Sequence, residues 1–209
     1  MDTRKFILSI FLIVVVLILF VAAKALIQYY IFPEKPVRPL PRFSANEKYG
    51  HFVGIIKTKW SQQNDFMILL EPVSYTDGNG KKWIVPKGAV VNGSSIPVDL
   101  WSVLGYAPYN GPHRIASVFH DYYTEKQTST WQTTHQMYYD ACLCSGVPII
   151  KAKLMFAALW HFGPKWGFSA KTFRGPLSTN QKKEKLQQLL PDLEQMSLEQ
   201  IKAIDMLDF

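Results

Sequence analysis

The first hydrophobic pattern along the chain is an uninterrupted apolar run near its N-terminus. Residues Phe6 to Ala23 carry no charge and only one hydroxyl group, that of Ser9. A helix of about 18 residues spans about 27 Å, which is close to the thickness of a bilayer core. We therefore predict one transmembrane helix within residues 1–32. It would make the chain a single-pass membrane protein that contacts lipid through this helix.

A cleaved signal peptide is the main alternative to this anchor. Arg4 and Lys5 form a positive start, and Ala23-Lys24-Ala25 resembles a cleavage site between small residues. The apolar run is longer than the usual signal-peptide core of about 7–15 residues, which favours an uncleaved anchor. A buried core helix is disfavoured because the run has no polar face. We expect the bacterial inner membrane, and the side on which the folded part lies stays open.

Polar and extended patterns follow the apolar run. Four prolines between Pro33 and Pro41 predict a semi-rigid linker over residues 33–43. Beyond it, short apolar runs predict strands, and Asp77-Gly78-Asn79-Gly80 predicts a hairpin turn between two of them. The predicted strands cover residues 52–57, 65–70, 73–75, 82–85 and 89–91.

The pattern then changes from strands to helices. Ile115, Val118, Phe119 and Tyr122 are spaced i, i+3, i+4 and i+7, which predicts a buried helical stripe. The predicted helices cover residues 98–104, 112–124, 130–144, 149–162, 181–190 and 197–206, the last opened by a capping box from Ser197 to Gln200.

We therefore predict an α+β fold. A small antiparallel sheet is followed by a helical half, and one transmembrane helix precedes both. The predicted folded domain covers residues 44–176, and amphipathic helices occupy residues 177–209.

Charge and cysteine content change this picture little. The net charge of +7 and pI near 9.3 raise nucleic acid or anionic membrane as partners. We expect no nucleic acid partner, because much of the charge lies beside the apolar run and no recognition motif is apparent. Cys142 and Cys144 are too few for a four-cysteine zinc site and poorly placed to bridge each other.

A polar centre is predicted on two helices of the helical half. His120 lies nearly opposite the apolar stripe of its helix, on a face of mostly small residues that would let another element approach closely. Together with Asp121 and with His135 on the next helix, it could supply three N and O ligands to a divalent metal. His120 and Asp121 would then be catalytic. The alternative is structural, with His120 buried and Asp121 paired with Arg114.

A loop precedes this centre in the sequence. Asn92, Ser94 and Ser95 form a polar turn that leads into Pro97, a residue suited to the first turn of a helix. The serines could be nucleophiles near His120, but capping the helix is their more common role. The chain has no G-x-S-x-G, H-E-x-x-H or phosphate-loop signature.

Six short motifs follow one another along the chain: Val85-Pro86-Lys87-Gly88, Asn92-Gly93-Ser94-Ser95-Ile96-Pro97, Trp101, His120-Asp121-Tyr122, Gly146-Val147 and Phe162-Gly163. In this order they resemble the bacterial and phage family known as domain of unknown function 1353. The resemblance covers about Phe52 to Trp166 and departs from the family pattern at three positions. Ala89 stands where the family usually has Phe, Asn92 where it has Asp, and His135 where it has an acidic residue. The resemblance implies a phage or prophage context but no established reaction.

Two functional hypotheses follow. In the first, the chain is an uncharacterised, membrane-anchored, phage- or prophage-associated interaction protein with a protein partner, and its polar centre is structural. In the second, it is a metal-dependent hydrolase centred on His120 and Asp121. We favour the first, because the sequence contains no complete catalytic constellation.

Overall fold

The computed structural model describes residues 47–61, 66–93, 96, 100–104, 110–167 and 177–205, with the isolated positions 15, 17 and 20. The chain divides into two compact units, Met1–Arg42 and Phe43–Phe209, and the following description concerns the second. Within the described ranges, no helix is long and apolar enough to cross a membrane. The predicted anchor, apart from those three positions, and the predicted linker lie outside the described residues.

The strand half of this unit consists of two small sheets. One has the strand order β1-β4-β5 and the other the order β2-β3-β6, and all neighbours are antiparallel. The strands are β1 (His51–Val53), β2 (Thr58–Trp60), β3 (Met67–Leu69), β4 (Val73–Thr76), β5 (Lys82–Val85) and β6 (Val90–Val91), preceded by the 3-10 helix η1 (Glu47–Tyr49).

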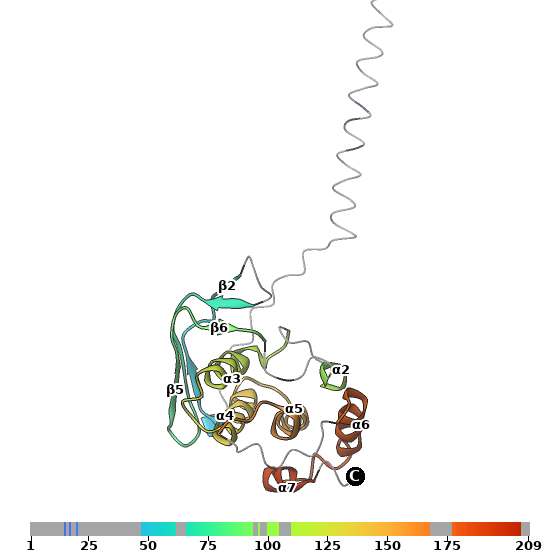
Figure 1. Cartoon of the computed structure of the whole chain (residues 1–209). Helices are drawn as coiled ribbons and strands as arrows, with labels where there is room; N and C mark the ends of the chain where they lie inside the picture. Colours follow the sequence, from blue (N-terminus) through green and yellow to red (C-terminus); the bar gives the residue numbers. More distant parts are fainter. Residues whose placement is uncertain are drawn as a thin grey trace, which may run out of the picture. The chain divides into compact units, whose positions relative to one another are not determined.

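The helical half follows, as the sequence predicts. The helices are α2 (Trp101–Leu104), α3 (Arg114–Lys126), α4 (Trp131–Cys144), α5 (Ile149–Phe162), α6 (Thr179–Leu189) and α7 (Leu198–Ala203). Helix α3 contacts β5 and β6, α4 packs on α3, α5 packs on α4, and α6 and α7 contact α5 (Figure 1). The α+β class and the helical half are therefore confirmed.

One row of aromatic side chains joins the first sheet to helix α3. Phe52, Tyr75 and Trp83 are register partners across β1, β4 and β5, and Tyr75 and Trp83 are buried. The ring of Phe119 on α3 lies 5.8 Å from Phe52 and 5.9 Å from Tyr75 between centroids. Since Phe119 belongs to the predicted apolar stripe, that stripe faces the sheet.

The strand prediction was wrong between Gly54 and Trp60. The sequence predicts one strand over residues 52–57, whereas β1 ends at Val53 and a new strand, β2, starts at Thr58. Gly54 has φ of +100°, a left-handed conformation that ends an extended strand. The break transfers the chain from one sheet to the other, so there are two sheets instead of one.

Turns and caps agree with the prediction more closely. The carboxylate of Asp77 accepts hydrogen bonds from the backbone N–H groups of Asn79 and Lys81 and from the indole N–H of Trp83, which fixes the predicted hairpin turn. The predicted capping box at Ser197 is present, and a second one opens α6 at Ser178. These local motifs fold as the sequence indicates.

Candidate functional site

The candidate site lies where α3 and α4 face each other. The side chains of His120 and Asp121 on α3 and of His135 on α4 are all buried. Ala116 and Ser117, one turn before His120, are buried as well. The small side chain of Ala116, one turn from His120 on the same face of α3, leaves room for α4 to approach, whereas Ser117 lines a cavity beside the second sheet.

The two histidines contact each other directly. The Nε2 atom of His120 lies 2.9 Å from the Nδ1 atom of His135, and the ring centroids are 5.1 Å apart. In this hydrogen bond one nitrogen carries the proton and the other accepts the bond, so the tautomer of one ring sets the tautomer of the other. The Nδ1 atom of His120 has no hydrogen-bond partner within the described ranges.

Burial keeps both rings neutral. It lowers the pKa of His120 well below its usual value, and the neighbouring His135 lowers it further. For His135 burial is again the main cause and lowers the pKa to about 4, with a smaller opposing effect from the Pro164 backbone. A neutral imidazole can ligate a metal or form a hydrogen bond, so both hypotheses accommodate this state.

Aromatic rings enclose the histidine pair. Tyr138 lies 5.0 Å from His120, and Trp131 and Trp166 lie 5.5 and 6.2 Å from His135, all between ring centroids. Such rings exclude water and account for the lowered pKa values. The sequence points to His120 and His135, but it does not show which aromatic residues surround them.

Asp121 contacts the loop that precedes the site in the sequence. Its Oδ2 atom accepts hydrogen bonds from the backbone N–H groups of Asn92, at 3.0 Å, and Gly93, at 2.9 Å. With its amide nitrogen facing the carboxylate, the Asn92 side chain donates to both oxygens as well, at 3.1 and 3.2 Å. Gly93 has φ of +92°, which brings consecutive amides to one acceptor.

The structure thus brings together four of the predicted site residues. Asn92 meets Asp121, and His120 meets His135. Ser94 and Ser95 lie outside the described residues. Among the described residues, no three His, Cys, Asp or Glu side chains are grouped so that they could hold a metal ion. The three-ligand metal site therefore stays a prediction.

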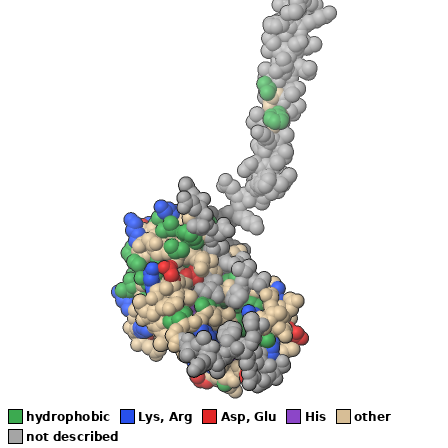
Figure 2. All heavy atoms as spheres, viewed as in Figure 1, with side chains coloured by type: hydrophobic (Ala, Val, Ile, Leu, Met, Phe, Trp, Pro, Cys, Tyr) green, Lys and Arg blue, Asp and Glu red, His purple; other side chains and the backbone are tan. Residues whose placement is uncertain are grey.

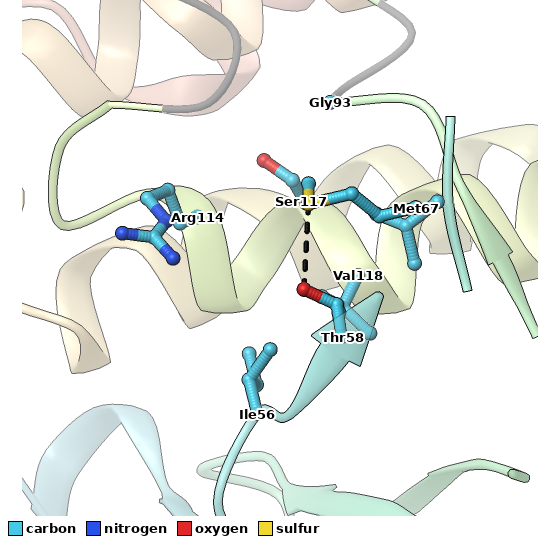
Figure 3. A pocket seen from close by; sticks show the side chains of 8 residues that line it. Ile56, Thr58, Met67, Gly93, Arg114, Ser117 and Val118 are labelled. Carbon is cyan, nitrogen blue, oxygen red and sulfur yellow. Dashed lines mark hydrogen bonds between the residues drawn. The ribbon is translucent and has the colours of Figure 1, made fainter. Parts of the chain in front are cut away.

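A small cavity borders the loop between the second sheet and α3. Thr58 and Met67 line it from the strands, and Arg114 and Ser117 line it from α3 (Figure 3). Its volume of about 20 Å³ is enough for about one water molecule. A cavity of this size cannot hold an organic substrate.

Asp140 on α4 is a half-buried acid that sequence reasoning missed. Burial raises its pKa to about 6. The only available signal was an acidic residue inside a mostly apolar helix, a pattern that also occurs at exposed positions. Cys142 and Cys144 on the same helix are free thiols, and the Cys144 Sγ atom donates to the carbonyl of Gly50.

With this geometry in place, comparison with known proteins shows which family part of the chain resembles. Residues 67–159, from β3 into α5, match the model of the family described as protein of unknown function (DUF1353). The resemblance predicted from the motifs is confirmed over these residues. The matching segment contains Asn92, His120, Asp121 and His135.

Two relatives come from Sinorhizobium fredii. Uncharacterized protein y4jT is 43% identical over 98 residues, which cover 47% of this chain and 29% of the relative. Uncharacterized protein y4iH is 39% identical over 101 residues, which cover 48% of this chain and 42% of the relative. The alignments thus span less than half the length of either relative. No solved structure matches this chain.

Proposed function

We propose that this chain is a membrane-tethered, phage- or prophage-associated interaction protein, in which the His-Asp centre stabilises the fold. One observation supports the structural role: a single oxygen of Asp121 accepts hydrogen bonds from the backbone N–H groups of both Asn92 and Gly93. A buried carboxylate with charge-assisted bonds to a loop organises that loop. The cavity beside it has no room for an organic substrate.

The tether rests on the sequence of the N-terminal unit. The apolar run from Phe6 to Ala23 has the length of a membrane helix, and the prolines between Pro33 and Pro41 suit a spacer. We propose four parts accordingly: an anchor at residues 1–32, a linker at 33–43, the α+β domain at 44–176 and C-terminal helices at 177–209. The bacterial inner membrane is the proposed location.

Membrane extraction tests the tether. The full chain, produced in a bacterial host, should sediment with membranes and stay there after an alkaline carbonate wash. A variant that lacks residues 6–23 should be released by the same wash. The intact mass of the membrane-bound chain distinguishes an anchor from a cleaved signal peptide. Full release of the uncleaved chain by carbonate would refute the tether.

A metal-dependent hydrolase is the second candidate. The pairing of two buried, neutral imidazoles favours it, because such nitrogens can ligate one divalent metal if their mutual hydrogen bond is given up. In this alternative His135 is a ligand, and His120 and Asp121 hold the metal and take part in catalysis. Metal content decides between the two candidates, as described at the end of the Discussion.

A further inference from the structure

The outward faces of the two sheets carry apolar side chains that nothing described covers. Val53 and Ile84 flank Ser74 across β1, β4 and β5, on the face opposite the buried aromatic row. The side chains of Val53 and Ile84 are 57% and 50% exposed. In the second sheet, Val90 is 37% exposed and is the register partner of Ile68.

Lysines surround these apolar positions. Lys82 lies two residues before Ile84 on the same strand face, and Lys59 is the register partner of Ile68. Lys87 is exposed in the turn between β5 and β6. On the strand side of the second unit, Figure 2 shows Lys and Arg side chains between hydrophobic ones. Glu125 on α3 lines a hollow together with Lys87 and Val90, so the rim is mainly but not wholly basic. Exposed apolar groups rimmed by polar residues mark an interaction surface.

Charge is distributed unequally between the two halves of this unit. Among the described residues of the strand half, six exposed lysines accompany a single exposed carboxylate, Glu71, which pairs with Lys57. The described helices and their connections have six exposed carboxylates and three exposed basic residues, and the half-buried Lys151, Lys182, Lys183 and Lys202 offset this excess of negative charge. The six lysines are Lys48, Lys57, Lys59, Lys81, Lys82 and Lys87; the six carboxylates are Glu125, Glu184, Asp192, Glu194, Glu199 and Asp205; the three basic residues are Arg114, Lys126 and Lys165.

We propose that the lysine-rimmed outer face of the sheets, formed by Val53, Lys59, Ile84, Lys87 and Val90, docks on an anionic phospholipid surface. The lysines would contact acidic headgroups, and the aliphatic side chains would enter the headgroup boundary. This proposal rests on the proposed tether only in that the tether keeps the folded unit near a bilayer.

A nucleic acid is a less suitable occupant of this face. Nucleic-acid surfaces present aromatic or arginine side chains for stacking on bases, whereas Val53, Ile84 and Val90 on this face are aliphatic. The exposed Trp60 follows Lys59 on β2 and therefore points to the other face of that strand. An aliphatic side chain gains from hydrocarbon contact, and a phosphate backbone offers none. Lipid therefore satisfies both the charge and the apolar part of the surface.

A nitroxide label on the full chain tests the docking. Cys142 and Cys144 are buried, so a maleimide-type label can be directed to a new cysteine in Ile84→Cys. Gln188→Cys on the exposed side of α6 is the matched control. The chain is added to vesicles of phosphatidylcholine alone or of an equal mixture with phosphatidylglycerol. Accessibility of each label to oxygen and to a water-soluble nickel chelate is then measured.

We expect the label at position 84 to lose nickel accessibility several-fold and to gain oxygen accessibility in the mixed vesicles only. The label at position 188 should not change, and Lys59→Glu with Lys87→Glu should abolish the effect at position 84. Val90→Cys gives a second labelling site if Ile84→Cys does not fold. Equal nickel accessibility at position 84 in both vesicles, or protection by an RNA oligonucleotide but not by lipid, would overturn the proposal.

The same samples separate the docking from the tether. If the chain floats with both kinds of vesicle but the label at position 84 is not protected, the tether is supported and the docking is overturned. Protection at position 84 in mixed vesicles, with no flotation on phosphatidylcholine alone, would support the docking and contradict the tether.

Discussion

At the scale of residues, the candidate site consists of two contacts, between Asp121 and its loop and between His120 and His135. The helical faces of α3 and α4 were readable from the sequence, so the meeting of His120 and His135 followed from periodicity. The partner of Asp121 could not be predicted in the same way. The sequence suggested Arg114 as a partner, whereas the folded chain places the backbone N–H groups of Asn92 and Gly93 against the Asp121 carboxylate.

Replacing Asp121 should loosen the loop. In Asp121→Asn a charged acceptor becomes neutral, and we expect the free energy of unfolding to fall by about 1–3 kcal/mol. Amide exchange at Asn92 and Gly93 should quicken. Glu125→Gln is the control, because Glu125 lies exposed on the same helix and pairs only with Lys126 within the described residues. Its effect should stay within about 0.5 kcal/mol. Equal effects of the two substitutions, measured by urea denaturation, would contradict the role of Asp121.

The family that this chain resembles usually has Asp at the position of Asn92. We expect this chain not to tolerate Asp there. Asn92→Asp replaces a donor to the Asp121 carboxylate by a second carboxylate. We expect a loss of about 1–3 kcal/mol at neutral pH, which shrinks in acid as the two groups share a proton. Denaturation at several pH values checks this. A variant as stable as the wild type at neutral pH would point to a cation that the two carboxylates share.

At the scale of elements, most helix ends were predicted to within a few residues. Their apolar residues recur with helical spacing, and caps such as Ser197 are local signals. The strands were harder, because strand β2 owes its existence to pairing with β3 and not to its own sequence. The break at Gly54 likewise depends on how two sheets meet, which a single sequence does not specify.

Two glycines test the packing of β1 against the hairpin turn. Gly50 and Gly80 have φ of +99° and +81°, so alanine is strained at both. A methyl group at position 50 would also lie 1.9 Å from the Thr76 carbonyl oxygen, whereas nothing lies within 4 Å at position 80. We expect Gly80→Ala to cost about 1–2 kcal/mol and Gly50→Ala at least about 2 kcal/mol more. Thermal unfolding of both variants measures the difference, and equal losses would contradict the packing.

At the scale of the whole molecule, stability should depend on pH through buried histidines. In the unfolded chain His120 and His135 titrate near pH 6.5, whereas burial lowers both pKa values in the fold, to about 4 for His135. Below about 6.5 the unfolded chain therefore binds more protons, and the free energy of unfolding should fall as the pH falls towards 4.

Asp140 opposes this trend. Its folded pKa is raised to about 6 from 3.8, so between these values the folded chain binds more protons and gains stability as the pH falls. Asp140→Asn removes the opposing contribution and should lose stability more steeply in acid than the wild type. Urea denaturation between pH 7 and pH 4.5 tests both expectations. Identical slopes for the two proteins would contradict the assigned role of Asp140.

The family resemblance and the α+β class could be predicted from motif order and periodicity, because both are local features of the sequence. The function did not follow, because DUF1353 members and the two relatives carry no stated activity. The central claim is therefore chemical: the His-Asp centre stabilises the fold without a metal ion.

The most direct test is the metal content of the purified full chain beside His120→Ala and His51→Ala, with folding checked by circular dichroism. His51 is exposed and serves as the control. Our account predicts no stoichiometric metal in any of them, a loss of about 2–4 kcal/mol in His120→Ala and almost none in His51→Ala. Near-stoichiometric divalent metal in the wild type, lost in a folded His120→Ala but kept in His51→Ala, would contradict it and favour the hydrolase.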